Sequence, residues 1–438
     1  MRKPRRWWHA RSRLRILREF LGTFGLAVAA SGAIAQGSPS AGYRAPDVRA
    51  DGWTTANADS LGVDSKRLAA LTQSVRAWPE LGVHAIVIER AGRLIYEEYF
   101  DGFDERWGEP LGRVTMSVTQ LHDIRSVTKS VVSALTGIAL GAGAIRSLDQ
   151  PVVEWFPEYP ELNTAERRRV TLAQGLGMTS GLEWNEEVPY SDPQNDEIRM
   201  TRDPQPLRYA LSPRFVHAPG AEFNYNGGLT HVMGAVLERA TKTPIEDYAR
   251  TKLFEPLGIT EFEWVGDLAG LPAIASGLRL RARDVAKFGS LYLHRGQWNG
   301  RQIIPAEWVD LSTRRHFRFR PQGTGGGEFG YEYFWWYNCY ASAAGLIEAR
   351  TAIGNGQQRI FVLPGLDMVV TILAGRYNDF RSGASLGTRI LREHVIPAVR
   401  TGVRPGCPGA NYRCQESSTS GAALFVSRTS PVPSAFIT

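Results

Sequence analysis

The chain has 438 residues, of which 43% are hydrophobic and 22% charged, a composition typical of a globular protein with a sizeable core. Its net charge of +7 is concentrated at the start, because residues 1–35 hold eight Arg or Lys and a single Glu. The remainder carries 43 basic and 43 acidic residues. The charge therefore gives no support to a nucleic-acid partner.

Residues 1–35 have the parts of a secretory signal: a basic start, an apolar run at 20–30 and a small-residue cleavage site, Ala33-Ile34-Ala35, before Gln36. The apolar run is too short and too rich in glycine for a stable membrane span. We therefore expect export, with a periplasmic or secreted mature protein and no span after cleavage. An uncleaved anchor is the alternative, and Arg5-Arg6 does not decide between export routes.

Gly, Ser, Pro, Ala and Asp dominate residues 36–60, which predicts a linker. From residue 64 the apolar residues recur at helical spacing, and a short amphipathic helix is expected. Apolar runs at 83–89 and 94–100, separated by a turn that contains glycine, predict a hairpin. The folded domain is predicted to extend from residue 61 to residue 400.

A second apolar series at helical spacing follows residue 126 and predicts a buried helix. The segment 183–206, rich in Asp, Asn, Pro and Glu, predicts a long surface loop, a feature that often serves as a lid. Residues 401–438 read as a low-complexity, disordered tail. Further helices are expected at 170–177, 229–240, 244–253, 283–294, 305–313 and 384–398, and late strands at 358–363 and 368–374.

Strands thus lie at both ends of the folded part, and helices fill its middle. This order predicts an α+β fold in which an antiparallel sheet from both chain ends is flanked by helices. A helical lobe, at about 123–285, is inserted in the sheet lobe. We expect a catalytic cleft between the two lobes.

Ser126 and Lys129 are three residues apart at the start of the buried helix, so their side chains share one face. A serine becomes nucleophilic when a base removes its proton, and a lysine serves as that base when burial lowers its pKa. The helix N-terminus also stabilises a developing oxyanion. The alternative is a chance S-x-x-K in which the serine caps the helix and the lysine is solvated.

Tyr225 lies in a turn that leads into the next long helix. A tyrosine beside an ammonium group has its pKa pulled down and can relay a proton between nucleophile and leaving group. The alternative is an ordinary core tyrosine, since the chain has 15 of them.

Three motifs, about a hundred residues apart, are Ser126-x-x-Lys129, Tyr225-Asn226-Gly227 and Gly354-Asn355-Gly356-Gln357. In this order they resemble the serine β-lactamase and penicillin-binding-protein superfamily, and within it the class C-related serine hydrolases, which include esterases and 6-aminohexanoate-oligomer hydrolases. The resemblance covers roughly residues 60 to 400.

The resemblance implies a β-lactamase/transpeptidase-like fold in which Ser126 is acylated, Lys129 is its base or base partner and Tyr225 relays the proton. It further implies an oxyanion hole made by the backbone N–H groups of Ser126 and Gln357. Which group deprotonates the serine stays open. The other residues expected near the substrate are Asn226, Asn355, Gly356 and, as an apolar acyl pocket or as plain core, Trp335 and Trp336.

Two motifs depart from the family pattern. Gly227 stands where the family has the Asn of Tyr-x-Asn, unless Asn226 takes that role shifted by one. Gly354-Asn355-Gly356 replaces Lys-Thr-Gly, whose Lys and Thr bind the carboxylate of β-lactams and peptides. We therefore expect an ester or amide hydrolase acting on a less charged small molecule. The alternatives are a β-lactamase or D-alanyl peptidase, and a catalytically silent cell-wall peptide-binding module.

Other signals are weaker. Ser385 lies in a G-x-S-x-G pattern, but no strand ends at it as a nucleophile elbow requires. Cys407 and Cys414 lie close enough to form a small disulfide loop in an exported protein, whereas Cys339 is expected to be buried and inert. No Cys/His spacing predicts a metal, and no cofactor is expected. Side chains of the long loop, among them Tyr190, contact either the substrate or solvent.

Overall fold

The computed structural model describes residues 42–266, 272–314, 317–319, 329–379 and 386–407. The predicted signal at 1–35, Ser385 and Cys414 lie outside these residues. Within them, no helix combines the length and the apolar character that crossing a bilayer requires.

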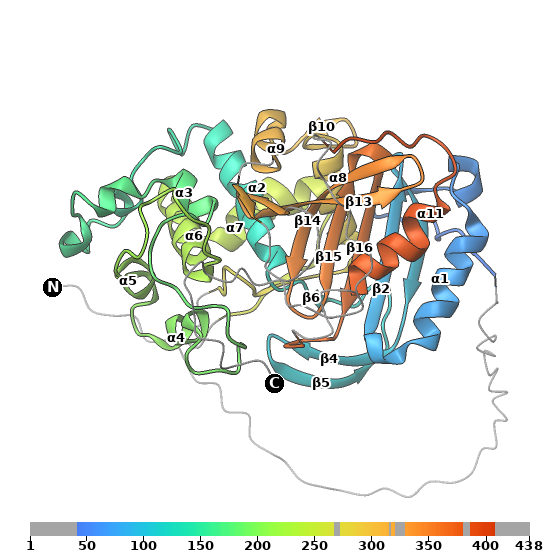
Figure 1. The fold of residues 1–438 in the computed structure, drawn as a ribbon, viewed down its shortest axis with the longest axis horizontal. Coiled ribbons are helices and arrows are strands. Elements are labelled where there is room, and N and C mark those ends of the chain that lie inside the picture. The colour runs from blue at the N-terminus through green and yellow to red at the C-terminus, as the bar shows by residue number, and fades with distance from the viewer. Residues whose placement is uncertain (1–41, 267–271, 315–316, 320–328, 380–385, 408–438) are drawn as a thin grey trace, which may run out of the picture. The chain divides into compact units, whose positions relative to one another are not determined.

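A nine-stranded sheet forms the centre of the fold (Figure 1). Its order is β1-β3-β2-β16-β15-β14-β13-β12-β11, and every neighbouring pair is antiparallel except β1 with β3. The first and last parts of the chain therefore meet at the pair β2 and β16. The strands are β1 (Thr54–Thr55), β2 (Val83–Arg90), β3 (Arg93–Tyr99), β11 (Phe317–Phe319), β12 (Phe329–Glu332), β13 (Trp335–Ser342), β14 (Gly345–Gly354), β15 (Gln358–Leu363) and β16 (Met368–Ala374).

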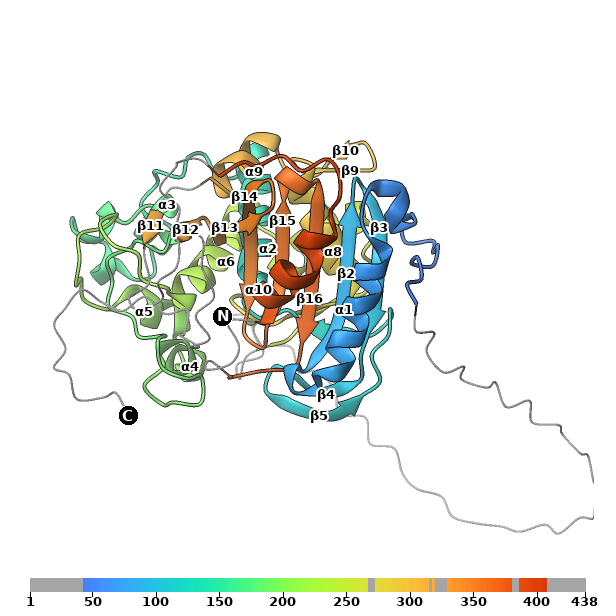
Figure 2. The same ribbon diagram turned by 45° about the vertical axis from the view of Figure 1, so that its right-hand side comes forward.

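Helices cover both faces of the sheet, as Figure 2 shows for α1 and α10 on one side and α8 on the other. The helices are α1 (Ser65–Ala77), α2 (Val127–Gly141), α3 (Leu172–Leu176), α4 (Asp196–Arg202), α5 (Pro206–Leu211), α6 (Gly227–Thr241), α7 (Ile245–Ala249), α8 (Ala282–Leu293), α9 (Ala306–Ser312), α10 (Leu386–Ile390) and α11 (Ile396–Ala398). Single π-helical turns, Arg250–Phe254 and Leu391–Val395, extend α7 and join α10 to α11. Short 3₁₀ helices occupy Ala58–Leu61, Pro79–Leu81, Val152–Trp155, Pro160–Leu162, Arg167–Arg169, Glu255–Leu257 and Pro364–Leu366.

Strand β2 shows how the two faces are filled. All eight of its residues are buried. Val87 packs in the core that contains α2 and α8, whereas Ile86 and Ile88 pack in the core that contains α1. Because side chains alternate across a strand, two covered faces favour apolar residues at successive positions, as at residues 85–88, which is why this strand lacks the polar alternation of a half-exposed one.

The helical part is an insertion that leaves and re-enters the fold at one place. Strand β6 (His122–Asp123) pairs with β8 (Leu278–Leu280), and the Ile124 N–H donates to the Leu278 carbonyl at 3.0 Å. Strand β8 also pairs with β7 (Glu263–Trp264). Helices α2 to α7 lie between these points.

The fold class is confirmed, and β15 and β16 have the predicted bounds. The sequence did not predict β13 and β14, the exposed hairpin of β4 (Gly102–Arg106) and β5 (Glu109–Val114), the small pair β9 (Gln297–Trp298) and β10 (Arg301–Gln302), or α4 inside the predicted loop. The polar, largely exposed β5 has no apolar alternation to find.

Residues 42–60 are packed on the domain, although the sequence predicts a linker there. The Tyr43 hydroxyl donates to the Ile95 carbonyl at 2.7 Å and accepts from the Ala58 N–H at 2.8 Å. At the other end, the Arg404 N–H donates to the Gly365 carbonyl, beyond the predicted boundary at residue 400. These bonds are made by partners distant in sequence, so local composition does not reveal them.

The cysteine prediction is wrong. Cys339 of β13 forms a disulfide with Cys407, 68 residues away, so Cys339 is not free and the small Cys407–Cys414 loop is not formed. Sequence distance favoured the short pairing, but the chain after Arg400 returns to β14, where the Gly406 N–H donates to the Leu346 carbonyl at 3.1 Å. That return brings Cys407 beside β13.

Replacing Cys339 by serine should lower the free energy of unfolding by about 2–4 kcal/mol under oxidising conditions, because the loop of 68 residues is then unconstrained in the unfolded chain. Urea unfolding of the two proteins measures this difference. Cys414→Ser is the control and should leave stability and the Cys339–Cys407 cross-link unchanged. Equal loss in both variants would contradict the observed pairing.

Candidate active site

Ser126 stands at the N-terminus of α2, held by a strained residue before it. Arg125 adopts φ +49°, in the left-handed region, which costs a non-glycine residue about 1–3 kcal/mol. Its guanidinium forms an ion pair with Glu105 and a second one with Asp123, at 3.0 Å between Nε and Oδ2. Ser126 itself is only partly buried. The anchored turn thus presents its hydroxyl where a substrate can reach it.

Lys129 lies one turn further along α2 and is 1% exposed. Its ammonium donates to Ser126 Oγ at 3.1 Å and to the Ala275 carbonyl at 3.2 Å. Glu197 Oε2 of α4 lies 3.9 Å from Nζ. A fully buried cation needs an anion and hydrogen-bond acceptors around it, and these three groups supply them.

Glu197 lies beside Glu186, and we call these two residues the carboxyl pair. Both side chains are buried and hydrogen-bonded to each other. Burial and then the charge of Glu197 raise the pKa of Glu186 well above its usual value. Burial also acts to raise the pKa of Glu197, but Lys129 and the hydrogen bonds of Glu186 and Ser276 outweigh it and lower that pKa. The two carboxyl groups therefore titrate as a pair, and Glu186 is the member whose pKa is raised.

The carboxyl pair changes the expected role of Lys129. Burial acts to lower its pKa, as the sequence argument assumed, but Tyr225, Glu197 and Glu186 outweigh burial and raise it. Lys129 is therefore a cation at neutral pH rather than a free amine. In this state its hydrogen bond to Ser126 Oγ polarises that oxygen.

Tyr225 completes the group of three. It is hydrogen-bonded to Ser126 and to Lys129, whose Nζ lies 5.1 Å from the centre of its ring. Burial raises its pKa, while Lys129 and the hydrogen bond with Ser126 act to lower it. Trp336 stacks on the same ring, with centroids 6.0 Å apart. The structure thus brings Ser126, Lys129 and Tyr225 together, as the sequence predicted.

The structure shows why position 227 holds glycine, where the family pattern Tyr-x-Asn has asparagine. A Cβ atom at this position would lie 2.6 Å from Glu197 Oε2 and 3.1 Å from Glu186 Oε2. The carboxyl pair therefore occupies the space that a side chain would need. Asn226 does not take over in a simple way, because its Oδ1 accepts the Leu229 N–H at 3.0 Å and caps α6. Its Nδ2 has no hydrogen-bond partner among the described residues.

The turn after β14 lies against the nucleophile segment. A Cβ atom on Gly354 would be 2.4 Å from the Ile124 carbonyl oxygen, so only glycine allows this approach. Gly356 and Gln357 follow at φ +89° and +78°. The Asn355 side chain points away into a reciprocal pair with Asn378, with Nδ2 donating to Oδ1 and the Asn378 N–H donating back, both at 2.8 Å. Asn355 therefore stabilises the turn.

Trp335 and Trp336 are neighbours on β13, and their side chains point to opposite faces of the sheet. Trp336 packs on Tyr225 and on Phe223, 6.0 Å between centroids, and so lines the site. Trp335 faces the opposite way, 1% exposed, with its ring 4.2 Å from that of Tyr292 of α8. Its assignment to the substrate site is wrong, because neighbouring residues of a strand point to opposite faces.

Glu186 and Glu197 are not predicted from the sequence. Tyr190 of the same loop is a predicted candidate and does contribute, since its hydroxyl donates to Glu186 Oε1 at 2.9 Å. Trp184 Nε1 and the Gly227 N–H donate to Glu186 Oε2 at 2.8 and 2.6 Å. The one indication of them in the sequence is the glycine at position 227, because the absence of a side chain there indicates that another group fills the space.

Residues 72–393 match the β-lactamase family, most of the chain. The chain therefore belongs to this family, and the resemblance stated from the sequence is confirmed. The octameric penicillin-binding protein homologue from Pyrococcus abyssi has a similar fold, with a TM-score of 0.54 at 19% identity over 70% of this chain and 73% of that one.

Two relatives are named as hydrolases. Esterase EstB of Burkholderia gladioli is 30% identical over 222 residues, which cover 48% of this chain and 54% of that protein. The 6-aminohexanoate-dimer hydrolase of Paenarthrobacter ureafaciens is 24% identical over 307 residues, which cover 66% and 72%. The match thus spans about half the length of the esterase.

Glu186→Gln should stabilise the protein increasingly as pH rises. A folded-state pKa above the usual 4.5 gives stability that is fully present below about pH 4.5 and is lost as pH rises through the folded pKa. The amide imitates the protonated acid at every pH, so the two unfolding free energies should agree at acid pH and diverge above it. Denaturant unfolding across the pH range measures the gap.

Glu183→Gln is the control, because Glu183 lies on the same loop but is exposed and paired with Arg214. Its effect should stay below about 1 kcal/mol at every pH. A difference between Glu186→Gln and the unmodified protein that stays constant or narrows as pH rises would mean that the folded-state pKa of Glu186 is not raised.

Proposed function

We propose that the protein hydrolyses a small ester or amide through an acyl-enzyme on Ser126. One observation carries the proposal: a buried ammonium and a phenol converge on a partly exposed serine hydroxyl. The names of the two relatives, an esterase and a hydrolase, support the same class of reaction.

The protonation states define the steps. Ser126 Oγ attacks the acyl carbon, and its proton passes to the Tyr225 oxygen while Tyr225 gives its own proton to the departing oxygen or nitrogen. A neutral tyrosine suits this relay, because it accepts and donates one proton at the same time. Lys129 keeps its proton and stabilises the charge that develops on Ser126 Oγ. A water molecule then repeats the sequence in place of the leaving group.

The carbonyl oxygen needs donors at the same time. We assign this role to the backbone N–H groups of Ser126 and Gln357, because the close approach of Gly354 to Ile124 brings the turn after β14 next to the nucleophile segment. Trp336, stacked on Tyr225, offers an apolar surface for the acyl group. Gly354-Asn355-Gly356 supplies no cation for a substrate carboxylate, which favours an uncharged ester over a β-lactam or a D-alanyl peptide.

A fluorophosphonate probe should label the protein once, at Ser126, and p-nitrophenyl esters of short acids should be turned over faster than nitrocefin. Ser126→Ala should abolish labelling and lower kcat/KM for the ester by at least about 10³-fold. Tyr225→Phe should lower it by about 10²–10⁴-fold, the range for a proton-transfer group. Peptide mass mapping and steady-state kinetics give both readouts.

Two control variants separate the alternatives. Tyr209→Phe removes a hydroxyl that bonds to Asp196 rather than to Ser126, and it should keep full activity. Ser385→Ala should keep the label. A label on Ser385 would move the nucleophile to the G-x-S-x-G pattern, and no label at all would favour a silent binding module. Faster turnover of nitrocefin would overturn the substrate class.

We further propose that the protein is exported to the periplasm or secreted, with cleavage after Ala35. The leader composition and the Cys339–Cys407 disulfide support this, since structural disulfides persist in oxidising compartments. Expressed with its leader in a Gram-negative host, the protein should be recovered outside the cytoplasm with Gln36 at its N-terminus. Fractionation with N-terminal sequencing tests this, and an intact leader in any fraction would contradict cleavage.

A further inference from the structure

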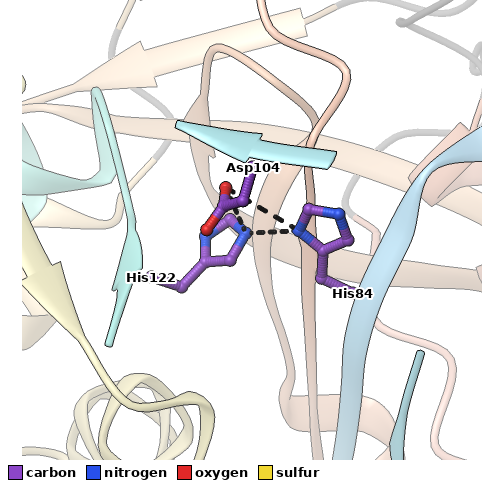
Figure 3. A group of neighbouring side chains, drawn as sticks. All are labelled: His84, Asp104 and His122. Carbon is purple, nitrogen blue, oxygen red and sulfur yellow. Dashed lines mark hydrogen bonds and ion pairs between the residues drawn. The ribbon is translucent and has the colours of Figure 1, made fainter. Parts of the chain in front are cut away.

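A second buried group of chemically active side chains lies outside the proposed reaction. His84 of β2, Asp104 of β4 and His122 of β6 point toward one another (Figure 3). Their side chains are 1%, 0% and 2% exposed. We call them the histidine cluster. Three strands distant in sequence thus direct two imidazoles and a carboxylate to one point without access to solvent.

The hydrogen bonds of His122 determine where its lone pair points. Its Nδ1 lies 2.8 Å from the Asp123 carbonyl oxygen, which only accepts, so Nδ1 carries the hydrogen. In the neutral ring Nε2 then has the lone pair, directed into the cluster. This is the arrangement that fixes a metal-binding imidazole, since a backbone carbonyl orients the ring through the other nitrogen.

The carboxylate is not satisfied by the two rings. Asp104 Oδ1 lies 3.5 Å from His122 Nε2 and 3.9 Å from His84 Nδ1, beyond hydrogen-bond distance for either. Oδ1 accepts from the Tyr377 hydroxyl at 2.9 Å, but Oδ2 has no hydrogen-bond partner among the described residues. The buried carboxylate of Asp104 faces the lone pair of His122 Nε2, and one of its oxygens has no hydrogen-bond partner among the described residues. This arrangement raises the free energy of the folded protein unless a cation lies between the carboxylate and the nitrogen.

The distances leave room for that cation. His84 Nδ1 and His122 Nε2 are 2.8 Å apart. The point equidistant from the three ligand atoms lies about 2.0 Å from each of them, which is the bond length of zinc to imidazole nitrogen and carboxylate oxygen. Asp104 Oδ2 is available as a fourth donor. Zinc, which accepts two nitrogens and carboxylate oxygens in irregular four-coordinate geometry, suits this set.

We propose that His84, Asp104 and His122 bind one zinc ion that stabilises the turn before Ser126 and the turn after β14. When zinc enters, the hydrogen shared by the two facing nitrogens moves to His84 Nε2, so both rings stay neutral and both bind through a lone pair. The burial of all three side chains favours a structural ion over a catalytic one. A Cβ atom on Gly102 would lie 2.4 Å from His84 Nε2, and one on Gly375 would lie 2.5 Å from His84 Cε1, so the ring edge that faces away from the cluster is closely packed and holds the ring in place.

The position of the cluster explains what the ion would stabilise. Strand β6, which carries His122, leads directly into Arg125 and Ser126. Tyr377, bonded to Asp104, lies under the Arg125 guanidinium at 4.7 Å and fills the space that a side chain on Gly356 would need. The cluster thus supports the strained turn before the nucleophile and the turn after β14 together.

Metal content decides the proposal. The full-length protein is unfolded in guanidinium with EDTA, refolded with equimolar Zn²⁺, desalted and measured by inductively coupled plasma mass spectrometry. We expect about one zinc per chain and a higher melting temperature than after refolding without metal. Refolding with Co²⁺ should give the visible absorption of a nitrogen- and oxygen-bound ion. Less than about 0.1 zinc per chain would overturn the proposal without recourse to any variant.

Variants locate the ion. Asp104→Asn and His122→Gln each remove one ligand with little change of shape, and retained zinc should fall at least about tenfold. His294→Gln is the matched control, because His294 faces the carboxylate of Glu89 at 2.8 Å without a second histidine in reach among the described residues. It should retain one zinc per chain. Equal zinc in folded Asp104→Asn and in wild type would show adventitious binding elsewhere and overturn the site.

Discussion

The ammonium of Lys129, enclosed inside the protein, is the constraint on which the site depends. Charge at such depth is tolerated only when an anion and well-placed acceptors surround it. The acceptors come from three places, the Ser126 hydroxyl on its own helix, the Ala275 carbonyl near β8 and Glu197 on α4. Packing α4 and the segment before β8 against α2 and positioning the nucleophile are therefore a single physical requirement.

Much of this arrangement was predictable because it is local. Apolar periodicity identifies α1, α2, α6 and α8, and unbroken apolar runs identify β15 and β16. The spacing of Ser126 and Lys129 on one helix predicts that their side chains meet. Tyr225 needed the resemblance to a family, since nothing near it in the sequence indicates which distant helix it would face.

What failed was in each case a pairing between distant segments. The carboxyl pair reaches Lys129 from a distant part of the sequence and, together with Tyr225, reverses the pKa direction that burial would give. Trp335 and Trp336 have identical local surroundings, and only the register of β13 against its neighbours separates core from site. The disulfide partner of Cys407 depends on the course of the chain in three dimensions, which the amino-acid composition does not predict. The histidine cluster also draws on three strands.

The bond between Ile124 and Leu278 joins the two ends of the helical insertion. The insertion thus begins and ends at neighbouring points, which is the geometry that allows one domain to be inserted into another. Its length and inner surface are therefore free to diverge while the sheet stays unchanged, except where the insertion delivers Glu197, Tyr225 and Ala275 to the nucleophile. New substrate specificity can arise in this protein through changes in the insertion that leave the structure of the sheet unchanged.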